Sequence, residues 1–463
     1  MVAHSDVFGR FTQGDTIPVM TQAVMENALS PRAIDQLVED VAQRRYTRDL
    51  LFSSIVELMS LVVGRIQPSI NAACLKDAVP IGASLQALSR KIGRIEDAIG
   101  SALVRKSDER LAPVITAMGG RLTPFLPGYR TKILDGNHVP GTEHRLKEWR
   151  TMRAGALAGH ALVVFDPAVM LAIDVVLCED GHAQERSLWD QVLATVAAKD
   201  PWIADRNSCT TDFLFGVAGR GGSFVIRQHA STLHCPLVGK RKARGRIETG
   251  AVFERTLRAT NDAGEVLILR RVAVVLDKPT RDGDTEIHLL TDLPVRDARA
   301  RVLATPYRRR WTIETASQGL EATRDGEIAT PGYPRAARFA LCVAPVSSNV
   351  LSTVKAALRG APGVEAITEE FSGYYLADEV RMSYRGMRRA IPKDERVGFQ
   401  ELPAPELAAA LVGWARTVPL SEYRKSPRGP KKPKPEKARG AKIKHVATAK
   451  ILKARKICTK CQV

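Results

Sequence analysis

The sequence predicts an α/β protein, because the pattern of apolar residues changes along the chain. Residues 1–125 carry amphipathic helical patterns, and residues 126–228 alternate short apolar strands with helices. Residues 229–305 have the alternation and the turn residues of a β-rich segment, and helical patterns return in residues 306–423. A chain of 463 residues is too long for one compact core, so we expect two or three domains.

The composition is that of a folded protein with a strongly basic end. Hydrophobic residues make up 44% and charged residues 26% of the chain, which excludes a wholly disordered protein. Residues 424–463 carry 15 Lys and Arg against the single acid Glu436, so this segment holds +14 of the formal net charge of +19. Its proline- and lysine-rich sequence cannot bury a core. We therefore expect a disordered basic tail that binds polyanions.

We expect the protein to work in the cytoplasm, without a membrane. No apolar run approaches the roughly 18 residues that a membrane helix needs, and residues 1–10 lack the pattern of an export signal. The seven cysteines are odd in number and mostly scattered, which is typical of a reducing compartment. Cys458 and Cys461 have the spacing of half a zinc site, but no second pair follows them. We interpret them as a free pair in the tail.

The helical patterns of residues 20–120 leave two interpretations open. Ser30 and Pro31 have the positions of an N-cap and a first helical residue, and amphipathic runs continue to about Leu111. One of the short runs carries three cations, Arg90, Lys91 and Arg94. This pattern resembles a helix-turn-helix bundle that binds DNA. A plain helical bundle that packs on the rest of the protein fits it equally well.

The following segment alternates strands and helices and places acids at strand ends. We expect strands at 132–138, 155–166 and 169–180, a helix at 184–197, a strand at 201–205, a helix at 210–218 and a strand at 223–229. Asp135 lies at the end of an apolar run, and Asp205 directly follows the apolar Trp-Ile-Ala of a buried strand. Three other aspartates near apolar runs, Asp174, Asp200 and Asp212, compete with Asp205. We expect Asp174, in mid-strand, to face outward and Asp200, before Pro201, to lie in a turn.

A third acid lies in a late helical segment. At about 100° per residue, Tyr307, Arg310 and Glu314 fall on one narrow face of a helix. A core face would be aliphatic at these positions, so this stripe indicates a function. Two strand-end carboxylates and one carboxylate on a late helix form the ligand set of a divalent metal pair in phosphodiester chemistry.

With these residues, the chain resembles the DDE transposases of bacterial insertion sequences. It is similar to the group with a Tyr-x2-Arg-x3-Glu-x6-Lys signature, which Tyr307, Arg310 and Glu314 match. Asp135 and Asp205 match the contexts of the two aspartates, whereas Glu321 stands where the signature has its lysine. The resemblance spans roughly residues 20–420. It implies an RNase H-like catalytic core, interrupted by a β-rich insertion between the second aspartate and the glutamate.

The resemblance also implies an activity, a cofactor and partners. The enzyme would cut element ends and join their 3′-hydroxyls to target DNA, with two Mg²⁺ ions, or Mn²⁺ as a substitute, bound by Asp135, Asp205 and Glu314. Its partner would be double-stranded DNA, and it would act as a homodimer on paired ends in the bacterial nucleoid. An alternative is a catalytically inactive, transposase-derived nucleic-acid-binding protein. Glu321 and the basic tail favour this alternative, and the intact acids oppose it.

Basic and polar residues near these acids are candidates for DNA contacts. Arg310 offers a planar fork for a phosphate, and Tyr307 can hydrogen-bond the same group. One basic patch follows Asp135 closely and contains Arg145, Lys147, Arg150 and Arg153. A second patch, which we expect on a loop of the insertion, contains Lys240, Arg241, Lys242, Arg244 and Arg246.

Overall fold

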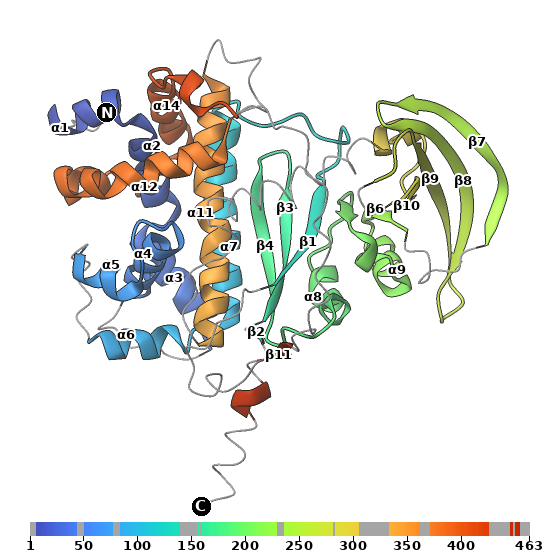
Figure 1. Cartoon of the computed structure of the whole chain (residues 1–463), viewed down its shortest axis with the longest axis horizontal. Helices are drawn as coiled ribbons and strands as arrows, with labels where there is room; N and C mark the ends of the chain where they lie inside the picture. Colours follow the sequence, from blue (N-terminus) through green and yellow to red (C-terminus); the bar gives the residue numbers. More distant parts are fainter. Residues whose placement is uncertain are drawn as a thin grey trace, which may run out of the picture.

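The protein combines a helical bundle with one large mixed β-sheet (Figure 1). The computed structural model describes residues 6–43, 51–76, 84–138, 155–157, 159–228, 236–280, 283–304, 333–361, 371–425, 445–447 and 450–453. Figure 1 shows the bundle on one side of the long helices α7 and α11 and the sheet on the other. These two helices pack on strand β4 and thus join the two parts.

Helices from both ends of the sequence form the bundle. The N-terminal helices are α1 (Asp6–Gly14), α2 (Thr16–Ala28), α3 (Pro31–Val41), α4 (Phe52–Val63), α5 (Ile70–Lys76), α6 (Leu85–Ile92) and α7 (Asp97–Ala117). The later helices are α11 (Pro334–Gly360), α12 (Gly373–Ala390), α13 (Lys393–Val397) and α14 (Ala404–Ala415), followed by the short η5 (Leu420–Tyr423). Helix α2 packs against α11, α12 and α14. The predicted N-cap is confirmed, because the Ser30 hydroxyl accepts from the Ala33 amide at 3.4 Å.

Helix α11 is the long core helix of the bundle. It is the one helix, in the part of the chain that the structure describes, that is long and apolar enough to cross a membrane. The expectation that no segment has this composition is therefore wrong. However, 67% of its apolar window is buried inside the protein, as in the core helix of a soluble fold. DNA binding by the bundle stays a prediction.

Nine strands form one sheet, in the order β4-β3-β1-β5-β6-β10-β9-β8-β7. Their bounds are β1 (Lys132–His138), β3 (His160–Asp166), β4 (Leu171–Cys178), β5 (Pro201–Ala204), β6 (Ser223–Arg227), β7 (Leu237–Ile247), β8 (Gly250–Thr260), β9 (Val266–Leu276) and β10 (Glu286–Thr291). Strand β5 is parallel to β1 and β6, and the other pairs are antiparallel. The sequence prediction of an α/β protein is confirmed, and strands occur where they were expected in residues 132–138, 160–166, 171–178, 201–204 and 223–227. Strand β7 was not predicted as a strand.

The two faces of the sheet pack on different helices. Four short segments connect the central strands, η3 (Glu185–Leu188), α8 (Trp189–Leu193), η4 (Arg206–Ser208) and α9 (Thr211–Gly219). Because side chains alternate along a strand, Ala161 of β3 packs in the core of α7 and α11. Its neighbour Leu162 packs in the core of α8 and α9. The sheet is therefore covered on both faces near its centre.

The β-rich segment extends this sheet. Strands β8 and β9 form the predicted hairpin, closed by the turn at Asn261–Gly264. Strand β10 pairs antiparallel with β6 and so joins β7–β9 to the central strands. A third apolar cluster lies at this junction and contains Ile203 of β5 beside Val252 and Val272 of the hairpin.

The tail does not fully match its prediction. Strand β11 (His445–Ala447) pairs in parallel with β2 (Gly155–Leu157), and Lys450 forms an ion pair with Asp180 at 2.8 Å. The expectation of a disordered tail is therefore wrong at these residues, because a backbone pairing and a charge pair hold them on the core. Cys458 and Cys461 lie outside the described residues.

Candidate functional site

Asp135 and Asp205 come together on adjacent parallel strands. Strand β1 pairs with β5 in the register Lys132 to Trp202 and Ile133 to Ile203. Continuing this register by two residues places Asp135 level with Asp205, on strands about 4.8 Å apart. Both side chains are half-buried.

The alternation of side chains places these two carboxylates on one face of the sheet. Leu134 and Ala204, one residue earlier on each strand, both pack in the core of α8 and α9. Asp135 and Asp205 therefore point to the opposite face. Their role as metal ligands stays a prediction from the sequence.

The local structure fixes the backbone of Asp205. This residue is the N-cap of η4, and its Oδ1 accepts a hydrogen bond from the Asn207 amide at 2.8 Å. Asp205 has an extended backbone, so it still follows the direction of β5. The end of a buried strand and the start of a short helix thus hold the carboxylate in place.

Glu185 is a further carboxylate near Asp205, and the sequence predictions did not include it. It lies on the face of the sheet toward α8 and α9, opposite to the face of Asp135. It begins η3, and its carboxylate lies where a Cβ atom on Gly136 would be. Asn207 Nδ2 donates to its Oε2 at 3.4 Å. Burial raises the pKa of Glu185, and the negative charge of Asp205 raises it further, whereas the bond from Asn207 lowers it. In the sequence, the glycine after Asp135 indicates this contact, because a residue without a Cβ atom leaves room for a side chain from another segment.

The donor chemistry suits hard divalent metals, because carboxylate oxygens are the usual ligands of Mg²⁺. Within the described ranges, no group of three or more His, Cys, Asp or Glu side chains is arranged to hold a metal ion. Two of the three predicted ligands, Asp135 and Asp205, converge. The third, Glu314, belongs to residues 305–332, which lie outside the described part together with Tyr307, Arg310 and Glu321.

Two of the competing aspartates, Asp174 and Asp200, form structural ion pairs. Asp174 is buried and bonded to Arg105 of α7 at 2.9 Å, so the expectation that it faces outward is wrong. Packing of α7 on β4 covers this carboxylate, and the arginine compensates its charge. Asp200 is also buried and pairs with Lys132 at 2.5 Å. Both buried carboxylates thus have a cationic partner, and the assignment of Asp205 stays a prediction.

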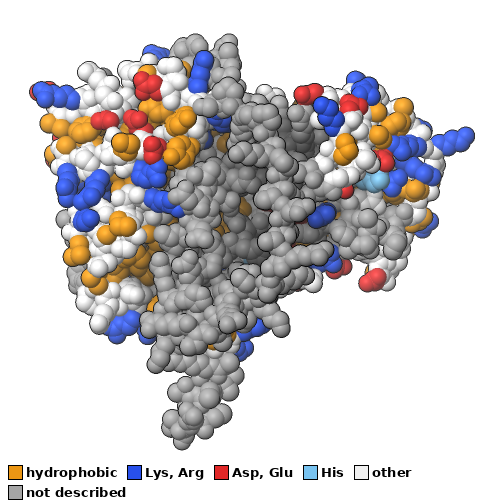
Figure 2. All heavy atoms as spheres, viewed as in Figure 1, with side chains coloured by type: hydrophobic (Ala, Val, Ile, Leu, Met, Phe, Trp, Pro, Cys, Tyr) orange, Lys and Arg blue, Asp and Glu red, His pale blue; other side chains and the backbone are white. Residues whose placement is uncertain are grey.

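The basic patch of the insertion lies on strand β7, so the expectation of a loop is wrong. Three of its arginines pair with acids of the insertion: Arg241 with Glu286 of β10 at 2.9 Å, Arg244 with Glu254 of the adjacent strand β8 at 2.6 Å, and Arg246 with Asp277, just after β9, at 2.7 Å. The pair of Arg244 and Glu254 joins two adjacent strands and stabilises the sheet. Figure 2 shows Lys and Arg side chains gathered over this end of the molecule. The other patch, Arg145, Lys147, Arg150 and Arg153, lies outside the described residues.

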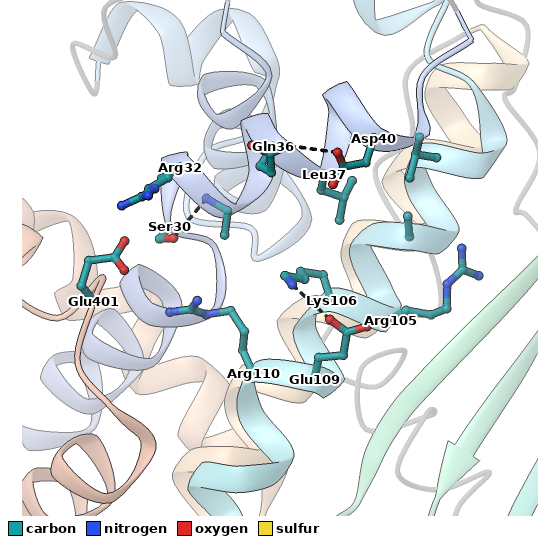
Figure 3. Close-up of a pocket in the computed structure, with 13 residues that line it drawn as sticks. Ser30, Arg32, Gln36, Leu37, Asp40, Arg105, Lys106, Glu109, Arg110 and Glu401 are labelled. Atoms are coloured by element: carbon teal, nitrogen blue, oxygen red, sulfur yellow. Dashed lines mark hydrogen bonds and ion pairs between the residues drawn. The ribbon is translucent and has the colours of Figure 1, made fainter.

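The helical bundle contains a cavity of about 510 Å³ (Figure 3). It opens between α3 and α7 of the bundle, and both cations and acids line it, among them Arg32, Lys106 and Glu109. Lys106 and Glu109 pair with each other at 3.1 Å. Neither Asp135 nor Asp205 lines this cavity, so it is not part of the carboxylate site.

Residues 126–322 match the family model of the transposase DDE domain. The match includes Asp135, Asp205 and the insertion, and it covers a little less than half of the chain. It supports a relation of this part of the chain to DDE transposases and hence a transposase function. No curated protein matches the chain.

Proposed function

We propose that the chain is a DNA transposase of the DDE type, with an RNase H-like core. The observation that carries the proposal is the level placement of Asp135 and Asp205 on β1 and β5, inside the residues that match the transposase DDE domain. The antiparallel strands β4 and β3 beside the parallel strands β1, β5 and β6 support such a core.

Asp135, Asp205 and Glu314 would hold two Mg²⁺ ions, or Mn²⁺ in their place, which when bound activate an attacking oxygen and stabilise a leaving oxygen. The chain supplies the positions of the carboxylates. Adjacent strands set the distance between Asp135 and Asp205, and the Asn207 amide orients Asp205. Three carboxylates in one place repel each other, so the site favours bound cations.

Contacts to the DNA backbone would come from cations around this site. On β7, the side chains of Lys240 and Lys242 are exposed and have no ion pair with the residues that the structure describes. They fit a backbone contact better than Arg241, Arg244 and Arg246, which already have acidic partners. Arg145, Lys147, Arg150, Arg153, Tyr307 and Arg310 remain proposed DNA contacts from the sequence.

The finer features of the proposal come from the sequence resemblance. The chain would belong to the group with the Tyr-x2-Arg-x3-Glu-x6-Lys signature, in which Glu321 is a departure. It would act as a homodimer that joins paired element ends to target DNA in the bacterial cytoplasm.

Cleavage of labelled duplexes from the DNA that flanks the gene tests the proposal. Asp135→Asn, Asp205→Asn and Glu314→Gln should each abolish Mg²⁺-dependent cleavage but keep DNA binding, since phosphate contacts come from Arg and Lys. Asp190→Asn, an exposed acid on α8, is the matched control and should cleave normally. Undiminished cleavage by Asp205→Asn would refute the assignment of Asp205 as a metal ligand. DNA binding without cleavage by the unsubstituted protein would favour the inactive, transposase-derived alternative.

A further inference from the structure

We propose that Arg255 and Arg271, on the face of the insertion that also carries Arg241 and His288, bind a phosphate group of the DNA backbone. The inference rests on the proposed function for the identity of the ligand. The geometry of the site rests on three arginines and a histidine, which lie on four neighbouring strands.

Two arginines face each other across the hairpin. In the antiparallel pair of β8 and β9, Arg255 is directly opposite Arg271, and both side chains are half-buried. Directly opposed side chains on one face of a sheet lie about 5 Å apart, and like charges at this distance destabilise the pairing. This cost would be offset by an anion held between the two guanidinium groups.

A third arginine and a histidine complete the cluster. The Arg241 guanidinium lies over the ring of Phe253, 4.0 Å from its centroid, and Phe253 is on the same face as Arg255 because it is two residues earlier. Arg255 Nε also donates to the Gly239 carbonyl of β7 at 2.8 Å. His288 of β10 is opposite Ala273, two residues from Arg271, and so shares this face.

The cluster holds more positive than negative charge. The acid in contact with it, among the described side chains, is Glu286, which already pairs with Arg241 at 2.9 Å and with His288 at 3.3 Å. The Nε atom of Arg271 is buried and has no hydrogen-bond partner within the described structure. Burial lowers the pKa of Arg271; Glu286 opposes this effect, whereas Arg255 and Arg241 add to it. A buried donor without an acceptor beside a second cation is the environment that an anion would satisfy.

The chemistry favours a phosphate of DNA. Guanidinium groups bind phosphate oxygens through paired, charge-assisted hydrogen bonds, and two opposed arginines can bind one phosphate from both sides. Figure 2 shows further Lys and Arg side chains around a histidine at this end of the molecule, which would contact neighbouring phosphates. A contact of this kind positions the duplex without reading its sequence.

The test compares Arg255→Gln and Arg271→Gln with the unsubstituted protein in DNA binding and in thermal unfolding. Each variant should weaken binding to a duplex roughly tenfold, and should reduce the slope of log K against log[salt] by about 0.9. Without DNA, the melting temperature of Arg255→Gln should stay the same or rise, because a repulsion is removed. Arg220→Gln, which removes an exposed arginine at the end of α9 that donates to the Gly216 carbonyl at 3.0 Å, is the matched control and should bind DNA nearly normally.

Unchanged DNA affinity of both variants would overturn the inference. A large fall in the melting temperature of the variants without DNA would also overturn it, because it would indicate that the arginines have a structural role. A titration with inorganic phosphate separates the possible ligands. Inorganic phosphate could raise the melting temperature of the unsubstituted protein but not of the variants, while the variants bind DNA normally. This result would also overturn the inference, because the arginines would then bind free phosphate and not DNA. Binding needs no cleavage, so a protein that binds through Arg255 but does not cut DNA would refute the proposed function alone.

Discussion

The carboxylate of Glu185 lies against Gly136, in the space that a Cβ atom at this position would occupy. Gly136 directly follows Asp135, and the partner of Glu185, Asn207, donates its backbone amide to Asp205. Glu185 thus contacts the backbone of β1 and the segment after β5, on the face of the sheet toward α8 and α9. Its charge is near that of Asp205, and the two negative charges together would attract a cation.

Gly136→Ala should therefore lower the affinity of the protein for Mn²⁺, because the added methyl group displaces the Glu185 carboxylate. The displaced group is the end of a flexible side chain, so the fold should persist. Glu185→Gln should lower Mn²⁺ affinity by a similar factor, because it removes the charge. Isothermal titration calorimetry with Mn²⁺ measures both effects.

Glu179→Gln, which removes an exposed acid before the same connection, serves as the control. Without metal, Glu185→Gln should also increase the free energy of unfolding at pH 7. The reason is that burial and Asp205 raise the pKa of Glu185, so the folded state disfavours its ionised form. Equal Mn²⁺ affinity of the unsubstituted protein and the three variants, at Gly136, Glu185 and Glu179, would show that Glu185 contributes to the fold and not to metal binding.

Removal of the buried acid Glu254 should strongly destabilise the insertion. Its carboxylate accepts from Arg244 at 2.6 Å and from Arg270 at 2.5 Å, and the side chains of Glu254 and Arg270 are only 8% and 12% exposed. Glu254→Gln leaves two arginines without their counter-charge, so we expect the free energy of unfolding to fall by about 3–5 kcal/mol. Urea denaturation measures this decrease.

The exposed pair of Arg246 and Asp277 is the comparison, and Asp277→Asn should cost less than about 1 kcal/mol. Burial raises the pKa of Glu254, but the two arginines outweigh burial and lower it overall. The stability that this carboxylate contributes is therefore present above its unfolded pKa and is lost as the pH falls through its folded pKa. Equal destabilisation in the two variants would contradict the prediction.

Local patterns in the sequence predicted most of the strands and singled out Asp135 and Asp205 as candidate ligands. Alternation of apolar residues marks β1, β3 and β4, and Asn261–Gly264 marks the hairpin turn. Asp135 and Asp205 were recognisable because each ends an apolar run. Such signals are contained within a few consecutive residues, and the structure preserves them.

Contacts between distant residues could not be predicted in this way. The charges of Lys240–Arg246 suggested a loop, because their acidic partners are remote: Glu286, for example, is 45 residues from Arg241. Burial of Asp174 depends on Arg105 of α7, and the position of Glu185 depends on the packing of η3 against Gly136. These arrangements require the assembled sheet.

Asp292 should make the protein less stable as the pH rises from about 4 to 6. Burial raises the pKa of this carboxyl from 3.8 to about 6, against the effect of its hydrogen bond from the Phe224 amide at 2.9 Å. A raised folded pKa gives stability that is fully present below the unfolded pKa and is lost as the pH rises through the folded pKa. The slope should disappear in Asp292→Asn, whose side-chain oxygen can still accept from Phe224.

At pH 7, Asp292→Asn should be more stable than the unsubstituted protein by up to about 3 kcal/mol. Denaturation in urea at several values of pH measures the difference between the two proteins. Asp262→Asn, in the exposed turn between β8 and β9, controls for the removal of one negative charge. A difference between the Asp292 variant and the unsubstituted protein that is independent of pH would refute this account.

The basic tail should add affinity for DNA without adding sequence preference. Residues 428–444 contain eight Lys and Arg and many prolines and glycines, a composition that offers charge but no fixed geometry for reading bases. Replacing these eight cations with Gln keeps the pairing of β11 with β2 and the ion pair of Lys450 with Asp180. Binding to all duplexes should then weaken by a similar factor. The slope of log K against log[salt] should become shallower by about 0.9 for each phosphate that the tail no longer neutralises.

Discrimination between element ends and random DNA should stay the same or improve, because only the non-specific contribution falls. A salt titration of both proteins on both kinds of DNA measures this. Truncation after Lys425 is the second variant, since it also removes β11 and Lys450 from the core. If the two variants differ in melting temperature but not in salt dependence, the ordered part of the tail stabilises the fold while the cations before it bind DNA. Unchanged salt slopes in both variants, or a lower specificity without the eight cations, would contradict a role limited to the DNA backbone.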